Sequence, residues 1–203
     1  INKNKLIMSF RKEKKFRLSN FDLILLKKKL IQSGLKRLHP SRIIFSEYLD
    51  TDNLQMFSDS EEGVLPRKKV RIRWYDKNKE KNLETKISSV EGRFKLIKRY
   101  FNNNNLEINT IFDQVYGKIY PSILIKYSRE YYFLNRLRIT IDTQIHYDDV
   151  RKKGQTSSQD KENVLEVKAN NEISDDYIEK IIPYPTSRFS KYCRGVSFLG
   201  RMI

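Results

Sequence analysis

Basic side chains alternate with apolar ones along several short stretches of this chain. The stretches are Arg11–Arg17, Val70–Trp74, Leu83–Ile87, Arg136–Asp142 and Leu165–Lys168. Successive side chains of a strand point to opposite faces, so each of the last four predicts a strand with one apolar face and one face of Arg, Lys and a few carboxylates. One sheet built from them would present a dense cationic surface.

A single strand of this kind usually has its charged face in water. Five such stretches change that balance, because Lys and Arg side chains packed together repel one another unless an anion lies among them. Arg binds two oxygens at once and Lys acts as a point charge, which suits a chain of phosphates. A polyanion is therefore the expected partner.

Carboxylates among these cations suggest a metal ion. The candidates are Glu13, Glu84 and Glu166, with Asp142 behind them. Mg²⁺ and Mn²⁺ take one or two carboxylates together with phosphate oxygens, so a metal would reconcile acidic residues with an anionic ligand. The alternative for any one of them is a cross-strand ion pair with Lys, worth about 0.2 to 1 kcal/mol.

Other kinds of site are not supported. The chain has only 7 glycines and no glycine-rich phosphate loop, so nucleotide binding would rely on side chains. His39 and His146 stand without a second ligand, which argues against zinc or a Ser-His-Asp triad. The single cysteine, Cys193, is interpreted as structural. The chemistry must come from carboxylates, Lys and Arg.

Composition places the chain among folded basic proteins. With 203 residues, 38% hydrophobic residues and 12% aromatics, we expect one β-rich domain over residues 1–203. The net charge of +16 would attract anions such as nucleic acid, nucleotides or polyphosphate. No apolar run is long enough to span a bilayer, and the lone cysteine fits a reducing compartment, so a cytoplasmic location is expected.

Strands and a few helices must position these residues. Ser19 with Asp22 forms a capping box for a helix over 21–31 that Gly34 ends. After a turn at His39-Pro40, strands are predicted at 42–50, 69–75, 83–87, 123–129, 137–147 and 164–168. A basic helical stretch is expected at 93–100, a loop at 102–105, a flexible connection at 154–163, and helices from Ser174 onward and around 187–191. The result is an α+β fold with an antiparallel sheet that could curl into a barrel.

A series of short motifs resembles one family over almost the whole chain. In order, they are Phe10–Phe16, Tyr48–Thr51, Lys69–Tyr75, Leu83–Lys86, Tyr127–Glu130, Arg138–Asp142, Leu165–Lys168 and Phe189–Tyr192. They are similar to VTC domains, the polyphosphate polymerase branch of the CYTH-like triphosphate tunnel metalloenzymes. The resemblance implies a closed tunnel of eight antiparallel strands with flanking helices, in which ATP and a growing polyphosphate chain bind with Mn²⁺ or Mg²⁺.

The resemblance also implies roles for particular residues. The family's triphosphate-binding side chains map to Lys15, Arg71, Arg73, Lys86, Arg129 and Arg138, and its late lysine maps to Lys191. Its metal-binding glutamate maps to Glu166, with Glu13 and Glu84 as the other candidates from the pattern itself. One departure is Glu91, which stands where the family commonly has a basic residue; Arg93 is the nearest replacement.

Two other functions remain open from the sequence. A triphosphatase would use the same tunnel with water in place of a phosphate acceptor. A binding module for RNA or polyphosphate would use the charge without turnover, but RNA-binding sheets display stacking aromatics beside their basic residues. Here the aromatics lie mostly on the apolar side of the pattern or in loops, so nucleic acid is not the expected partner.

Overall fold

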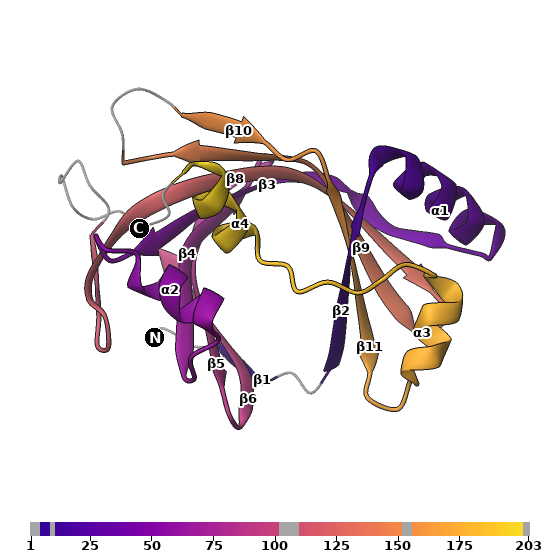
Figure 1. Ribbon diagram of the computed structural model, residues 1–203, viewed down its shortest axis with the longest axis horizontal. Coiled ribbons are helices and arrows are strands. Elements are labelled where there is room, and N and C mark those ends of the chain that lie inside the picture. Colours follow the sequence, from indigo (N-terminus) through magenta and orange to yellow (C-terminus); the bar gives the residue numbers. More distant parts are fainter. Residues whose placement is uncertain (1–4, 9–10, 102–109, 152–155, 201–203) are drawn as a thin grey trace.

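One antiparallel sheet that curls strongly on itself forms the body of the protein (Figure 1). The computed structural model describes residues 5–8, 11–101, 110–151 and 156–200. The strands are β1 (Lys5–Met8), β2 (Arg11–Leu18), β3 (Lys36–Asp50), β4 (Arg67–Tyr75), β5 (Asn78–Ser89), β6 (Gly92–Tyr100), β7 (Ile111–Asp113), β8 (Gly117–Leu134), β9 (Leu137–Asp149), β10 (Ser157–Gln159) and β11 (Asn163–Asn170). Their order is β1-β6-β5-β4-β3-β8-β9-β11-β2, with β7 beside β8 and β10 beside β9.

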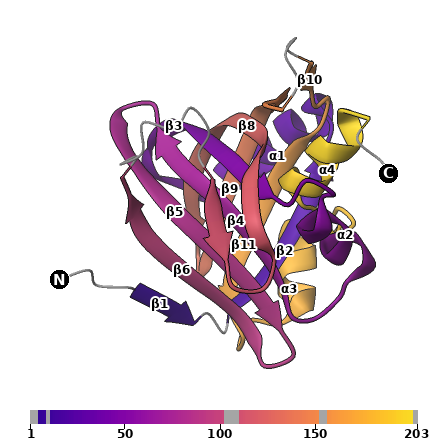
Figure 2. The same cartoon turned by 90° about the vertical axis from the view of Figure 1, so that its left-hand side faces the viewer.

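The expected antiparallel sheet with flanking helices is confirmed, but the closed ring of eight strands is not what the described residues form. Their pairing order has two ends, β1 and β2. The reason is that β1 pairs with β6 and β2 pairs with β11, whereas β1 and β2 do not pair with each other, so the ladder of hydrogen bonds among the described residues stays open between them. Figure 2 shows β1 alongside β6. The curl still brings distant strands together, since Lys86 of β5 acts electrostatically on Glu13 of β2.

Helices cover the outside of the sheet and one end of its inside. The helices are α1 (Asn20–Gln32), α2 (Gln55–Glu62), α3 (Asp175–Ile181) and α4 (Lys191–Phe198). Leu26 of α1 and Ile178 of α3 share a core with Ile139 and Leu165 on the outer face. By contrast, α4 lies within the curl and packs Tyr192 and Val196 against strand residues such as Tyr147 (Figure 1). Figure 2 shows α2, α3 and α4 together on one side of the view and strands such as β5 and β6 on the other.

Several element predictions are confirmed. Ser19 caps α1 by accepting a hydrogen bond from the Asp22 amide, and Gly34 follows the helix with φ of 94°. The strands predicted around 69–75, 83–87, 123–129, 137–147 and 164–168 all exist, most of them longer than expected. The predicted loop at 102–105 and the start of the connection at 154–163 lie outside the described residues, and β10 occupies 157–159 of that connection.

Other element predictions were wrong. The stretch 93–100 is the strand β6, because it pairs with β5 along nine positions and this pairing outweighs local helix preference. The strand β3 runs through His39-Pro40, where register shifts accommodate the proline. The helix α2 was not predicted, and the helix expected around 187–191 begins only at Lys191.

Gly195 sets how closely α4 approaches the sheet, which generates a stability prediction. A Cβ atom at this position would lie 2.4 Å from Ile123 Cδ1 and 2.6 Å from Tyr147 Cδ1. The Ile123 methyl could rotate away, but the Tyr147 ring is buried and its hydroxyl donates to Asp160 at 2.8 Å. We expect Gly195→Ala to destabilise the fold by about 1 to 3 kcal/mol. Thermal unfolding would measure this, with exposed Ser197→Ala on the same helix as a near-neutral control; equal melting temperatures would contradict it.

Candidate functional site

The concave face of the sheet gathers charged side chains from most of its strands. Cross-strand pairs such as Arg71 with Glu84 and Lys86 with Lys95 lie on the same face, since directly paired residues point the same way. The central part of the concave face contains the basic residues Lys15, Lys69, Arg71, Arg73, Lys86, Lys95, Arg129, Lys168 and Lys191, and the acidic residues Glu13, Glu84, Asp142 and Glu166. Nine cations against four carboxylates leave a surplus of positive charge.

Glu84 is the centre of a first cluster. Its Oε2 accepts from Arg71 Nε at 2.8 Å and Nη2 at 2.5 Å, and its Oε1 accepts from Lys95 Nζ at 2.8 Å. Arg73 Nη1 lies 3.7 Å away. Burial would raise the pKa of Glu84, but Arg71, Arg73 and Lys95 lower it to about 2. Glu84 is therefore ionised at neutral pH and holds three cations together.

Two tyrosines complete this cluster by accepting hydrogen bonds from the arginines. Arg71 Nη1 donates to Tyr48 OH at 2.9 Å, and Arg73 Nη2 donates to Tyr127 OH at 2.9 Å. Burial would raise the pKa of Tyr48, but Arg71 and Arg73 lower it to about 8. The positive charge of the site thus makes the Tyr48 hydroxyl more acidic than an ordinary tyrosine.

Asp142 is the centre of a second cluster. Arg129 donates to both of its oxygens, at 2.5 and 2.7 Å, and Lys191 from the start of α4 donates at 2.5 Å. Lys191 Nζ also lies 4.8 Å from the centre of the Tyr127 ring. Although Asp142 is almost fully buried, Arg129 and Lys191 hold its pKa below the usual value. The helix α4 therefore contributes a cation to a site built mainly by strands.

Glu13 and Glu166 form a third group, on the neighbouring strands β2 and β11. Lys15 Nζ lies 3.3 Å from Glu13, and Lys168 Nζ lies 3.1 Å from Glu166. Burial opposes ionisation of Glu13, but Lys86, Lys15 and Lys168 lower its pKa to about 2. The pKa of Glu166 is also lowered, because Lys168, Lys15 and Arg129 outweigh burial and the nearby Glu13 charge. Both carboxylates are ionised at neutral pH.

This third group fits the predicted metal better than Glu84 does. Two ionised carboxylates on adjacent strands are the protein ligands that Mg²⁺ or Mn²⁺ uses when phosphate oxygens and water supply the rest. Within the described residues, no group of three or more His, Cys, Asp or Glu could hold a metal by itself, so phosphate oxygens would be needed. Glu84 is already bonded to Arg71 and Lys95.

The structure brings together most of the predicted residues. Lys15, Arg71, Arg73, Lys86, Arg129 and Lys191 all belong to the concave face. Arg138 lies at its margin, exposed and paired with Lys168 across the sheet. Glu91 lies in the exposed turn between β5 and β6. On β6 itself, Lys95 takes the inward position beside Glu84, and Arg93 is exposed.

Sequence reasoning missed five members of the site. Lys69 and Lys168 continue alternations that were recognised, two residues from Arg71 and Glu166, and could have been included on that signal. Lys95 was hidden by the incorrect helix prediction. The sequence did not indicate that Tyr48 and Tyr127 bind arginines, because each hydrogen bond joins residues on different strands, 23 and 54 residues apart.

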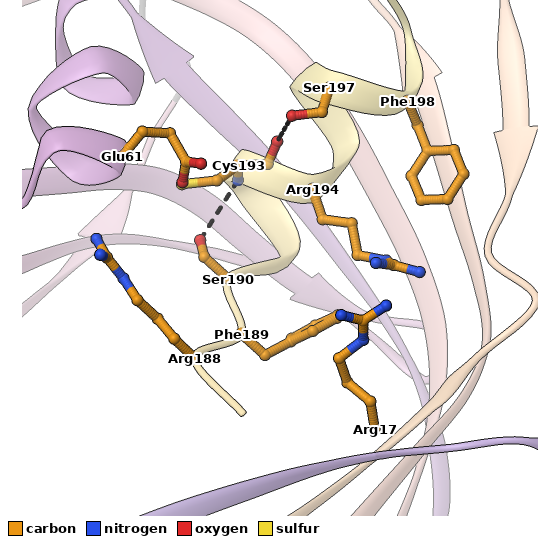
Figure 3. A pocket seen from close by; sticks show the side chains of 9 residues that line it. All are labelled: Arg17, Glu61, Arg188, Phe189, Ser190, Cys193, Arg194, Ser197 and Phe198. Carbon is orange, nitrogen blue, oxygen red and sulfur yellow. Dashed lines mark hydrogen bonds between the residues drawn. The ribbon is translucent and has the colours of Figure 1, made fainter. Parts of the chain in front are cut away.

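A pocket of about 410 Å³ lies at the end of the concave face that α4 fills (Figure 3). Its lining includes Arg17, Glu61 and Arg194, and none of the predicted site residues. Arg194 is bound to Asp160 at 2.5 Å, and Arg17 to Glu162 at 2.8 Å, so the charge of both arginines is neutralised. Lys69 reaches this end of the site by donating to Ser190 Oγ at 2.9 Å. The cation clusters, and not this pocket, are therefore the candidate site.

No helix of the described structure is long and apolar enough to cross a membrane.

Comparison with solved structures supports the fold. A candidate adenylate cyclase from Vibrio parahaemolyticus aligns with a TM-score of 0.53 at 14% identity, covering 94% of this chain and 99% of that one. A candidate adenylyl cyclase from Hippeastrum, described as having a dominant triphosphatase activity, aligns with a TM-score of 0.53 at 15% identity, covering 92% and 95%. A Pyrococcus horikoshii protein aligns with a TM-score of 0.54 at 15% identity, covering 90% and 98%. At these identities the likeness shows the fold alone.

Comparison by sequence identifies the family. No curated protein matches the chain. The model of the VTC domain matches residues 10–114 and 95–200, which together take in nearly all of the sequence. The motifs that carry the resemblance lie on the strands that build the concave face, together with the start of α4. The chain therefore belongs to the VTC domain family, with the curled sheet of the CYTH-like triphosphate tunnel fold.

Proposed function

We propose that this chain is a metal-dependent polyphosphate polymerase, which transfers the terminal phosphate of ATP to a polyphosphate chain and releases ADP. In this reaction the bond between the γ-phosphorus and the oxygen bridging to the β-phosphate breaks. A terminal oxygen of the acceptor chain forms the new bond, and ADP keeps the bridging oxygen. The observation that carries the proposal is the surplus of inward-facing cations around ionised carboxylates.

Positioning and charge neutralisation are what such a transfer needs from a protein, because negative charge spreads over the oxygens of the transferred phosphate. In this proposal Arg71, Arg73 and Arg129 bind phosphate oxygens, while Lys15, Lys86 and Lys191 neutralise charge along the path of the chain. Arg138 extends that path at its margin. In this proposal the curled sheet, whose edge strands are β1 and β2, surrounds the bound chain as a tunnel.

Glu166, with Glu13, would hold the divalent cation in this proposal. Bound there, Mn²⁺ or Mg²⁺ would contribute positive charge to the phosphate oxygens. Lys15 and Lys168 keep both carboxylates ionised in the absence of metal, so the ligands need no prior loss of a proton.

The amount of charge favours a phosphate acceptor over water. A triphosphate bound to one divalent cation keeps only about two negative charges. Nine cations facing four carboxylates exceed that need and leave positive charge for a second anion. An acceptor polyphosphate gains from this surplus, whereas a water molecule does not.

The direct test is product formation from ATP with Mn²⁺ or Mg²⁺. We expect long phosphate chains on a gel, together with ADP. Glu166→Gln keeps the size of the side chain but removes the charge that a divalent cation needs, so it should abolish chain formation while ATP binding is retained. Glu172→Gln, on an exposed side chain outside the clusters, is the matched control. Free phosphate without chains would instead identify a triphosphatase.

Arg71 should contribute to binding and to stability in separable ways. Arg71→Ala removes a charged donor and should weaken tripolyphosphate binding about 10- to 100-fold. It also leaves the buried Glu84 with weaker partners, so the ligand-free protein should lose about 1 to 3 kcal/mol of stability. Adding Glu84→Gln removes the buried negative charge that Arg71 no longer neutralises. The double variant should regain most of the melting temperature but not the affinity for tripolyphosphate. Recovery of binding in the double variant would show that Arg71 is structural.

Tyr48 should make phosphate binding sensitive to alkaline pH. Its pKa of about 8 means that it becomes a phenolate as pH rises above that value, adding negative charge beside Arg71. The dissociation constant for tripolyphosphate should therefore increase from pH 7 to 9. Tyr48→Phe cannot ionise, so its binding should stay nearly constant over this range. The same loss of affinity in Tyr48→Phe would assign the effect to another group.

A further inference from the structure

Arg42, Tyr75 and Tyr131 lie together on the concave face, one step beyond the arginines of the candidate site. Tyr75 follows Arg73 by two residues on β4, and Tyr131 follows Arg129 by two residues on β8. Arg42 of β3 pairs directly with Arg129. Two residues along a strand correspond to about 7 Å, so this group adjoins the phosphate-binding arginines. The apolar side chains of α4 pack against an earlier part of β8, at Ile123, Ile125 and Tyr127.

The geometry of this group is that of a cation between two aromatic rings. Arg42 Cζ lies 5.7 Å from the ring centres of both Tyr75 and Tyr131. His39 meets the Tyr131 ring edge-on at 5.2 Å, which supports its orientation. The two tyrosines are half-buried, whereas Arg42 is exposed. Two aromatic rings and a guanidinium are thus grouped beside the phosphate site, with the guanidinium open to solvent.

Within the described structure, the charge of Arg42 is not neutralised in the way that the charges of Arg71 and Arg129 are. Glu84 neutralises Arg71, and Asp142 neutralises Arg129. Over the described ranges, no carboxylate oxygen lies within 4 Å of an Arg42 nitrogen. In those ranges its guanidinium interacts with the two tyrosine rings. Its guanidinium therefore remains available to a ligand.

A phosphate chain does not stack on aromatic rings, because it presents only charged oxygens. A nucleobase, in contrast, stacks on tyrosine rings and on guanidinium planes. We propose that Arg42, Tyr75 and Tyr131 form a subsite for the nucleobase of the nucleoside triphosphate, whose phosphates then reach Arg73 and Arg129. This inference rests on the proposed function, since it assigns the base of the same substrate.

The test compares a ligand that has a base with one that has none. Dissociation constants for ATP and for tripolyphosphate would be measured with the wild-type protein and with the double variant Tyr75→Leu, Tyr131→Leu. Loss of stacking should weaken ATP binding about tenfold or more, while tripolyphosphate binding changes less than about twofold. The double variant Tyr75→Phe, Tyr131→Phe keeps both rings and should bind ATP as the wild type does. Tyr177→Leu, on α3 outside the sheet, is the matched control.

Tyr75 packs partly against the core, so replacing it by Leu could weaken ATP binding by disturbing the fold. A second variant therefore tests the subsite without changing a core residue. Arg42 is exposed, so Arg42→Lys should leave the fold intact while it replaces the planar group by a point charge. We expect weaker binding of ATP, about threefold or more, and unchanged binding of tripolyphosphate. Equal weakening of both ligands in these variants would make the group a phosphate contact and overturn the subsite. Unchanged ATP binding in all of them would also overturn it.

Failure of the proposed function would give a different result. A wild-type protein that binds neither ATP nor tripolyphosphate would refute the phosphate site itself, and the subsite with it. Tripolyphosphate binding that matches ATP binding in every variant would leave the phosphate site standing and remove only the nucleobase subsite.

Discussion

Neutralisation of clustered cations by a few buried carboxylates is the interaction on which this structure depends. The curl of the sheet turns basic side chains from many strands inward, and their mutual repulsion would open it if nothing opposed them. Glu84 binds cations from β4 and β6, which share no hydrogen bonds, and Asp142 binds one cation from β8 and one from α4. The carboxylates thus hold the cations in position and also neutralise part of their charge.

The same carboxylates make the site ready for an anion. Arg71 and Arg129 are held at defined positions before any ligand arrives, which reduces the conformational entropy lost on binding. Phosphate oxygens can take the hydrogen bonds that the carboxylates do not use, and surplus lysines compensate the added negative charge. Rigid strands carry most of these groups, which suits a reaction that depends on positioning.

Local sequence patterns predicted the strands, the charged face and most of its members, because a period of two is a property of each strand alone. Two features were not predictable in this way: that the ring of strands stays open, and that residues 93–100 form the strand β6. Both depend on which strands become neighbours. The clusters are of mixed origin: Glu84 meets Arg71 and Lys95 across consecutive antiparallel strands, whereas Asp142 is joined by Lys191 from a distant helix. Sequence alternation identifies which face is charged, and topology decides which charges touch.

Two parts of the concave face differ in a way that bears on how a substrate would lie. At one end α4 fills the curl with apolar side chains such as Val196, and its Lys191 completes the cluster at Asp142. Beside this cluster, across the strand from Arg129, Arg42 lies exposed between two tyrosines. A phosphate chain is the same along its length, but a nucleoside triphosphate has an aromatic end and an anionic end. In the proposed function, an asymmetric site of this kind would favour one orientation of the nucleotide and would leave the remaining cations along the face for the acceptor chain.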